Sequence, residues 1–195
     1  MCRGCVGGVI DVTPDCCRNV KKVGFMKGFF VALLLGTLAL PVVAQKCDVS
    51  KPATAPFNQF KVNDNGSITD TASNLVWLRC GLGMSWNGSS CEGQTLSYGW
   101  HSAVAAVKEL NTKKVAGRND WRLPSLSELQ SIVEKRCFKP AIDLDAFPFT
   151  PESGFWSSTE SEGANPRAMM VLFIHGQAYV ANKNQSWRVR PVAGR

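Results

Sequence analysis

Residues 124–128 set a sharp boundary between a loop and a helix. Ser125 is followed three residues later by Glu128, the spacing of a capping box, in which side chains and backbone N–H groups of the first turn pair reciprocally. Pro124 has no backbone N–H and prevents an earlier helix start. We therefore predict a helix from residue 126 to about residue 135, with an apolar face made of Leu126, Leu129, Ile132 and Val133.

A second helix is predicted from residue 97 to about residue 110, because apolar residues recur there at intervals of three and four: Trp100, Ala103, Val104, Val107 and Leu110. Short strands are predicted at residues 60–63, 67–69, 75–78, 155–158, 169–174, 178–181 and 187–192. The pair Asn65-Gly66 is a strong hairpin signal. Two central helices among short antiparallel strands and long irregular loops indicate an α+β domain.

The first 44 residues are interpreted separately. Residues 29–40 form an apolar run of the length found in secretory signals, and the small-residue site Val42-Val43-Ala44 follows. We predict a signal peptide at residues 26–44. The alternative is an uncleaved anchor, for which the run is short, because a relaxed span needs roughly 20 apolar residues. Residues 1–25 are interpreted as an over-long gene start or a disordered leader, residues 45–59 as an extended arm, and residues 60–195 as the folded domain.

Four cysteines follow the predicted signal peptide: Cys47, Cys80, Cys91 and Cys137. An even number of cysteines in an exported chain indicates two disulfides. Three pairings can be drawn. A bridge between Cys80 and Cys91 suits the short Gly- and Ser-rich interval between them, and it leaves Cys47 to pair with Cys137. A zinc site is the rival interpretation, but neither histidine stands at ligand-like spacing from these cysteines.

The charge of the chain is mildly basic. The net charge is +7, and it falls to +4 without residues 1–44, which carry five of the basic and two of the acidic residues. Such an excess suits an acidic partner, for example a sulfated glycan or a bacterial surface polymer. The sequence has no run of Lys and Arg of the kind that binds nucleic acid.

The sequence lacks the motifs Gly-x-Ser-x-Gly and His-Glu-x-x-His and has no phosphate-binding loop. Asp143 and Asp145 could act as paired carboxylates, but two acids in a proline-rich loop are more typical of solvated or capping residues. Ser157, Ser158 and His175 would form a nucleophile set only if folding brought them together. Polar positions of strands are the preferred interpretation of these three residues.

Several segments together resemble one family, the Lcl C-terminal domain family, named for the terminal module of a bacterial collagen-like adhesin. They are Leu75-Val76-Trp77, Arg79-Cys80, Asp120-Trp121-Arg122-Leu123-Pro124, Glu128-Leu129, Phe155-Trp156-Ser157-Ser158-Thr159 and Arg188-Val189-Arg190. The resemblance covers about residues 60–191. It implies an exported module of C-type-lectin-like fold, similar to formylglycine-generating enzymes, which in its best-known setting contacts sulfated glycosaminoglycans. The sequence contains no collagen-like Gly-x-y tract, and the late cysteine pair of the formylglycine-generating oxidases is absent.

Two groups of residues follow from these patterns. Residues of the loop-to-helix motif and one strand are expected to build the core or to start the helix, with an ion pair between the arginine and an acid: Trp121, Arg122, Pro124, Ser125, Glu128 and Trp156. Residues in irregular segments are expected to contact a ligand, because loops usually carry recognition: Trp86, Asn87, Arg167, Asn182, Lys183 and Asn184. Trp86 stands apart from the other tryptophans, because an aromatic ring in a glycine-rich loop either stacks on a sugar or plugs the loop.

The preferred hypothesis is a non-catalytic binding module, periplasmic or secreted, that recognises a glycan or another surface polymer and takes part in adhesion. It needs no cofactor or metal, binds no nucleic acid, and meets the membrane only through its signal peptide during export. The first alternative is a structural component of a pilus or envelope complex that docks on an envelope protein. The second alternative, an oxidase or a hydrolase, has the least support in the sequence.

Overall fold

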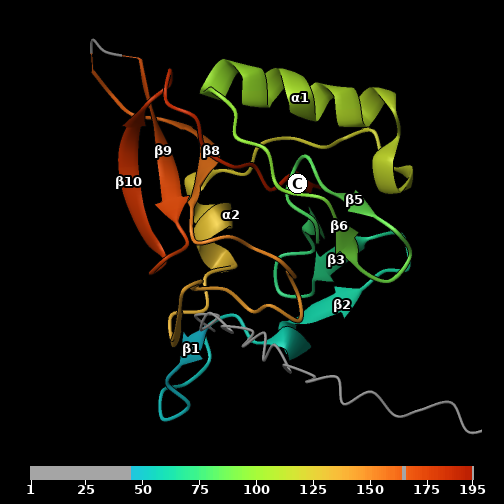
Figure 1. The fold of residues 1–195 in the computed structure, drawn as a ribbon, viewed down its shortest axis with the longest axis vertical. Coiled ribbons are helices and arrows are strands. Elements are labelled where there is room, and N and C mark those ends of the chain that lie inside the picture. Colours follow the sequence, from blue (N-terminus) through green and yellow to red (C-terminus); the bar gives the residue numbers. More distant parts are fainter. Residues whose placement is uncertain (1–44, 164–165, 195) are drawn as a thin grey trace, which may run out of the picture. The chain divides into compact units, whose positions relative to one another are not determined.

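The computed structural model describes residues 45–163 and 166–194, so the predicted leader and signal peptide lie outside the described residues. Figure 1 shows two α-helices among short strands and long connections. The helices are α1 (Trp100–Thr112) and α2 (Leu126–Ser131), with 3-10 turns at Phe57–Gln59 and Val115–Gly117. The strands are β1 (Lys46–Cys47), β2 (Phe60–Val62), β3 (Ser67–Asp70), β4 (Val76–Leu78), β5 (Ser85–Trp86), β6 (Cys91–Glu92), β7 (Cys137–Phe138), β8 (Gly154–Glu160), β9 (Arg167–Leu172), β10 (Gln177–Asn182) and β11 (Val192–Ala193).

All paired strands are antiparallel. One sheet has the order β11-β4-β3-β2 and another the order β10-β9-β8, while β1 pairs with β7 and β5 pairs with β6. The predicted α+β class is therefore confirmed. Within the described residues, no helix is long and apolar enough to cross a membrane.

The capping box at the start of α2 is confirmed. Ser125 Oγ accepts a hydrogen bond of 3.2 Å from the Glu128 N–H, and Glu128 Oε2 accepts one of 2.7 Å from the Ser125 N–H. The same carboxylate forms a bidentate pair with Arg122, with two N···O distances of 2.7 Å. The expected pairing of Arg122 with an acid is thus confirmed. Because Arg122 also donates to the Gly194 carbonyl, the pair joins the helix start to the end of the described chain.

Both helices differ in length from the prediction for the same physical reason. α1 begins at Trp100 instead of residue 97, because Tyr98 is held in extended backbone by two hydrogen bonds with Trp187. α2 ends at Ser131 instead of about residue 135, because the chain turns so that Glu134 can meet the residues before β2. Tertiary contacts override the apolar periodicity at these helix ends.

The predicted closing strand at residues 187–192 is largely wrong. Trp187 and Arg188 make only isolated bridges, to Tyr98 and Phe155, and the regular strand β11 is limited to Val192–Ala193. The cause is that this stretch passes from one sheet to the other, so it cannot pair along its length with one partner. It thereby joins β8 to the four-stranded sheet.

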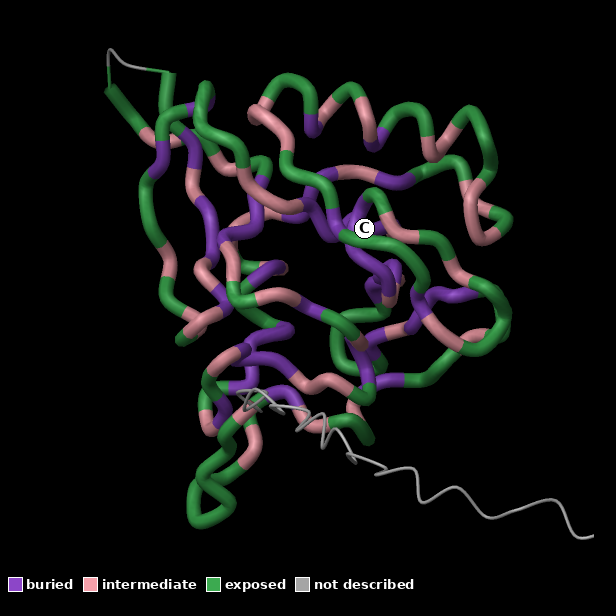
Figure 2. Tube along the Cα trace, in the orientation of Figure 1, coloured by how far each residue is buried: buried purple, intermediate pink, exposed green. Residues whose placement is uncertain are grey.

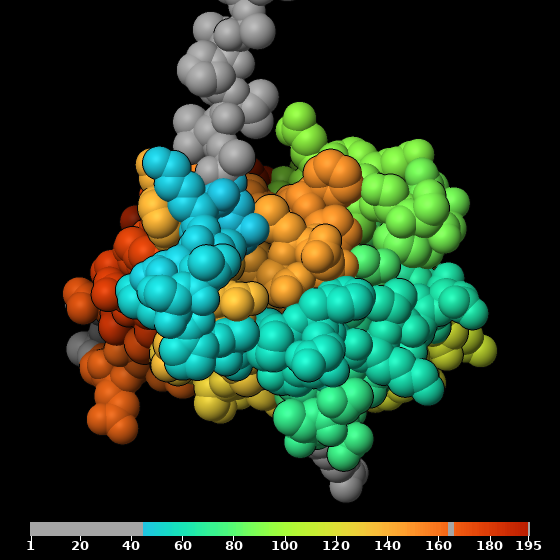
Figure 3. Space-filling model, turned by 90° about the horizontal axis from the view of Figure 1, so that it is seen from below, coloured from blue at the N-terminus to red at the C-terminus, as the bar shows by residue number. Residues whose placement is uncertain are grey.

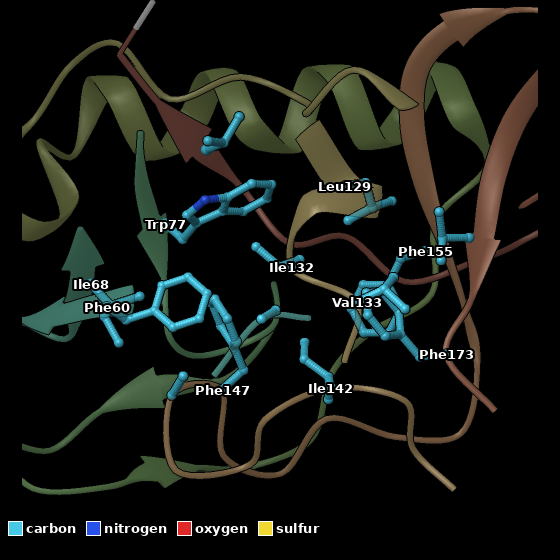
Figure 4. Packing of buried hydrophobic residues seen from close by; sticks show 14 of the residues in the cluster. Phe60, Ile68, Trp77, Leu129, Ile132, Val133, Ile142, Phe147, Phe155 and Phe173 are labelled. Atoms are coloured by element: carbon cyan, nitrogen blue, oxygen red, sulfur yellow. The ribbon is translucent and has the colours of Figure 1, made fainter. Parts of the chain in front are cut away.

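The four-stranded and the three-stranded sheet each carry apolar residues on both faces, so the core has two parts. Successive strand residues point to opposite faces, and accordingly Trp77 and Phe155 lie in one cluster while their neighbours Leu78 and Trp156 lie in the other. The first cluster, shown in Figure 4, includes Phe147 edge-on to Trp77. The second lies under α1 and also contains Trp121, Leu123, Ala103 and Val107. The core positions predicted for Trp121 and Trp156 are confirmed.

Residues 45–59 begin extended, as expected, but they are bound to the domain. The side chain of Gln45 donates to the carbonyls of Pro140 and Ile142, and the carboxylate of Glu134 accepts the N–H groups of Thr54 and Ala55. Figure 3 shows these first described residues lying across the loop that follows β7. Ala55 is fully buried, so this segment contributes to the core.

Both predicted disulfides are confirmed. Cys47 pairs with Cys137, which links β1 to β7, and Cys80 pairs with Cys91, which closes the loop around β5. Two structural disulfides indicate a location outside the cytoplasm, where thiols are not kept reduced.

Candidate binding site

A pocket of about 270 Å³ lies between the chain that follows β6 and the loop that precedes β8. Its lining residues are Met84, Gly93, Gln94, Thr95, Phe149, Pro151 and Arg188. None of them is an acid, a histidine or a cysteine. The pocket therefore offers one cation, amide and hydroxyl groups, and an apolar wall.

Arg188 is the charged group of this pocket. It is half-buried, and its backbone is fixed between β8 residues, since its N–H donates to Gly154 and its carbonyl accepts from Trp156. The Nη1 atom donates to the Thr95 carbonyl. Every ion pair among the described residues involves other side chains, so the Arg188 guanidinium has no carboxylate partner there. Among the described residues, the only hydrogen bond of the guanidinium is this one from Nη1, and the buried Nε atom has no partner.

Phe149 forms the apolar wall opposite the loop of residues 93–95. The residue is 63% exposed, and its backbone has a φ of 55°, in the left-handed region that non-glycine residues seldom adopt. The next residue, Thr150, holds the loop in place, because its Oγ1 donates to the Phe147 carbonyl at 2.7 Å and accepts 2.7 Å from Arg190 Nη2. The Phe149 ring is thus exposed on a loop that the hydrogen bonds of Thr150 hold to the protein interior.

Arg190 lies beneath this loop, two residues beyond Arg188. It is fully buried, donates to the Leu78 carbonyl at 2.9 Å, and places its guanidinium 4.9 Å from the Phe147 ring centroid. Burial lowers the pKa of Arg190 to about 9, so the group remains charged at neutral pH. Arg188 therefore lines the pocket, whereas Arg190 supports the loop that forms its apolar wall.

The loop between Cys80 and Thr95 forms the other wall. Gly81 lies directly against Thr95, since an added Cβ on Gly81 would overlap Thr95 Cγ2. The disulfide between Cys80 and Cys91 closes the same loop, so the positions of Met84, Gln94 and Thr95 depend on it.

Two larger cavities lie beside α1, with volumes of about 420 and 470 Å³. In the first, the side chain of Asn111 is bonded to the backbone of Trp121 on both sides, and Arg122 is paired with Glu128. In the second, the side-chain N–H of Asn65 is bonded to the Ala116 carbonyl. These polar groups are already paired, although Lys108 of the first cavity makes no ion pair among the described residues. The Arg188 pocket is the stronger candidate because its half-buried arginine lies beside an exposed aromatic ring.

The two ligand residues predicted in the disulfide loop do not line the Arg188 pocket. Trp86 is half-buried: it packs on Gly66, where an added Cβ would lie 2.5 Å from Trp86 Cγ, and Arg79 stacks over its ring at 5.1 Å. This packing matches the alternative that Trp86 plugs its loop. Asn87 is exposed, but its side chain accepts from Ser89 and Ser90 N–H groups and donates to Glu92 at 2.6 Å, which shapes the turn.

The other four predicted ligand residues are brought together at one end of the three-stranded sheet. Arg167 and Asn182 are opposite each other in the register of β9 and β10, and Asn184 is exposed beside them. Lys183 departs from the expectation of a free loop cation, because it is buried. Its Nζ lies 2.6 Å from Glu160 Oε2 and 4.0 Å from the centroid of the Trp100 ring.

The serine and histidine set considered in the sequence is not assembled. Gly154 is opposite Leu172 in the register, so His175 lies beyond the first end of β8, whereas Ser157 and Ser158 lie toward its other end. Ser157 Oγ donates to the Met169 carbonyl at 2.8 Å and is buried. Asp143 Oδ1 accepts the N–H groups of Asp145 and Ala146, which is a capping role. No cluster of potential metal ligands occurs among the described residues.

Arg188, Phe149 and Thr95 were not among the predicted ligand residues, and Arg188 was named only within the segment Arg188-Val189-Arg190. Phe149 lies between Pro148 and Pro151 in an irregular loop, but Phe147 of the same loop is fully buried, so composition alone did not distinguish the two rings. Arg188 gave no signal either, since it was placed in a strand. Its lack of a partner depends on which acids the fold brings near, and spacing along the chain does not report that.

A comparison with curated proteins finds no match to this chain. The family model of the Lcl C-terminal domain matches residues 66–193, which is more than half of the 195 residues. All residues that line the Arg188 pocket lie within this match. The chain therefore belongs to the Lcl C-terminal domain family.

Proposed function

We propose that this protein is a non-catalytic binding module that recognises an acidic glycan, or a surface polymer of similar chemistry, in the Arg188 pocket. The observation that carries the proposal is a half-buried guanidinium without a carboxylate partner in the described residues, beside an exposed aromatic ring. A carboxylate or sulfate group of the glycan pairs with Arg188, and the apolar face of a sugar ring packs on Phe149.

The size and polarity of the pocket support this ligand class. A volume of about 270 Å³ lies just below the range of roughly 300–1,000 Å³ typical of drug-sized ligands. It suits one sugar-sized group of a longer chain. The planar guanidinium of arginine suits anions that accept two hydrogen bonds, and Gln94 and Thr95 add groups that can bond sugar hydroxyls.

The wider setting is part of the same proposal. Two helices, short antiparallel strands, long loops and two disulfides suit a C-type-lectin-like module. The disulfides and the apolar run at residues 29–40 favour export to the periplasm or the exterior. The absence of acids, histidines and cysteines from the pocket lining favours binding without catalysis.

Titration calorimetry with a heparin-derived tetrasaccharide tests the proposal through a matched pair of variants. Arg188→Gln and Arg167→Gln each remove one positive charge, but only Arg188 lines the pocket. A hydrogen bond to a charged group contributes about 1.5–3 kcal/mol, so we expect Arg188→Gln to weaken binding about tenfold or more. Arg167→Gln should change the affinity less than about twofold. Phe149→Ala also weakens binding, because it removes the apolar wall.

Three results would count against the proposal. No measurable binding of the wild-type protein removes it altogether. Equal losses in Arg188→Gln and Arg167→Gln indicate unspecific attraction by net charge. Shortening of the tetrasaccharide during incubation, followed by size-exclusion chromatography, contradicts the absence of catalysis.

A further inference from the structure

Strand β10 forms one edge of the three-stranded sheet. Among the described strands it pairs only with β9, so alternate N–H and C=O groups along its other side have no strand partner. Figure 1 shows β10 at the outer margin of the sheet, and Figure 2 shows that most of its trace is exposed. Such an edge is a template for a further strand.

The composition of β10 does nothing to block such pairing. Gln177–Asn182 contains no charged residue and no proline, and its register with β9 is unbroken over all six residues. Natural edge strands are normally protected by charges, prolines, bulges or shortness. Tyr179 and Val180 are 40% and 48% exposed, and as neighbours in a strand they point to opposite faces. Both faces of this edge therefore display apolar surface.

The other edges of the two larger sheets have the usual protection. β2 has three residues and carries Lys61, and β11 has two residues, both buried. At the other edge of the three-stranded sheet, the register of β8 is irregular between Trp156 and Glu160, and Arg188 bridges to Phe155. Among the described strands at the edges of these sheets, β10 alone is long, regular and uncharged.

We propose that β10 pairs with β10 of a second copy of this chain, antiparallel and about a twofold axis at Tyr179, to form a continuous six-stranded sheet. The side chains of opposed residues share a face in antiparallel pairs, so a twofold pairing must be centred on a residue. Centring on Tyr179 places the two Tyr179 rings side by side and Ala178 opposite Val180 of the second copy. The small side chain of Ala178 thus leaves room for the larger side chain of Val180.

The second copy is favoured because it supplies what this edge requires. An uncharged extended strand with an open edge and exposed apolar residues on both faces complements β10, and β10 of a second copy has each of these properties. A net positive chain would repel its own copy at a charged edge, but no like charges oppose each other along β10. This inference does not depend on the glycan-binding proposal.

Sedimentation velocity of the purified protein over a wide concentration range tests the pairing. A concentration-dependent dimer is expected. Val180→Lys weakens the dimer about tenfold or more, because it puts a charge at the centre of the new pair in each copy. Val62→Lys is the matched control, since Val62 is 40% exposed on edge strand β2 and its replacement leaves the dimer unchanged.

A charge exchange tests the register. The double variant Ala178→Glu/Val180→Lys sets opposite charges across the twofold axis and restores dimerisation relative to Val180→Lys alone. A monomer at all concentrations overturns the proposal, and so does a dimer that Val180→Lys leaves intact. A dimer that Val180→Lys disrupts but the double variant fails to restore rules out the Tyr179-centred pairing. Circular dichroism of each variant confirms that the fold is retained before these comparisons are made.

Discussion

Arg190 Nη2 donates a hydrogen bond of 2.7 Å to Thr150 Oγ1, across forty residues of sequence. The bond joins the fully buried guanidinium to the loop that presents Phe149. Thr150→Val keeps the shape of the side chain but leaves a buried N–H of Arg190 without its acceptor. We expect a loss of about 1–3 kcal/mol in the free energy of unfolding, measured by urea denaturation.

Thr150→Ser is the control for that substitution, because it keeps the hydroxyl group and removes one methyl group. Its expected loss is about 1 kcal/mol. A Thr150→Val variant as stable as the wild type would mean that the hydrogen bond contributes nothing to stability. Glycan affinity should fall in Thr150→Val as well, since the loop that carries Phe149 loses its support.

Gly81 and Thr95 are expected to show a strong pairwise dependence. Gly81→Ala places a Cβ against Thr95 Cγ2, and overpacking of this kind destabilises by about 1–3 kcal/mol. Thr95→Ser removes the methyl group concerned, so the double variant Gly81→Ala/Thr95→Ser should recover part of the loss. Thermal unfolding of the two single variants and the double variant measures the coupling, and strictly additive losses would contradict the contact.

The two disulfides should have separable effects. Replacing Cys80 and Cys91 by serine frees the loop that bears Met84, Gln94 and Thr95, so we expect both lower stability, by about 3 kcal/mol from loop entropy, and weaker glycan binding. Replacing Cys47 and Cys137 removes a longer closed loop, worth about 4–5 kcal/mol, but touches no residue of the Arg188 pocket. Affinity measured below the unfolding temperature should therefore change only in the first case.

The Arg122–Glu128 pair should make stability depend on pH. The hydrogen bond from Arg122 is the main cause that lowers the pKa of Glu128 below its ordinary value of 4.5. Between the lowered pKa and the ordinary one, the unfolded chain binds more protons than the folded one. The stabilisation is therefore complete above about pH 4.5 and is lost as the pH falls through the folded-state pKa.

Glu128→Gln isolates this contribution. The wild-type midpoint of thermal unfolding should fall more steeply between neutral and acid pH than that of the variant, so the difference between the two proteins narrows as the pH is lowered. A difference that stays constant with pH would assign the effect to packing instead of ionisation.

Local features of this fold could be predicted from the sequence. Ser125 and Glu128 are three residues apart, and Arg122 is six residues from its partner, so their interactions follow from short spacing. The Cys80–Cys91 bridge is similarly local. Once these two cysteines are paired, Cys137 is the one partner that remains for Cys47 among the four cysteines after the predicted signal peptide. Chain proximity supplied the information in each case.

Features that depend on distant contacts could not be predicted. The early end of α2 is tied to hydrogen bonds between Glu134 and residues about 80 positions earlier. Arg190 finds its carbonyl partner Leu78 across 112 residues. The Arg188 pocket combines segments near residues 84, 95, 149 and 188, so neither its shape nor its unpaired charge is visible in any one segment.

Residues 45–62 contact the rest of the domain, so they belong in any fragment that is expected to fold. The family match begins at residue 66, after β1 and β2. A fragment cut to residues 66–193 would leave the buried Glu134 carboxylate without two of its N–H donors and would expose the edge of β3. It would also leave Cys137 as a free thiol, available for cross-linking between molecules. Recombinant production of that fragment should therefore yield aggregated, covalently linked material, whereas a chain that starts at Gln45 keeps every one of these contacts.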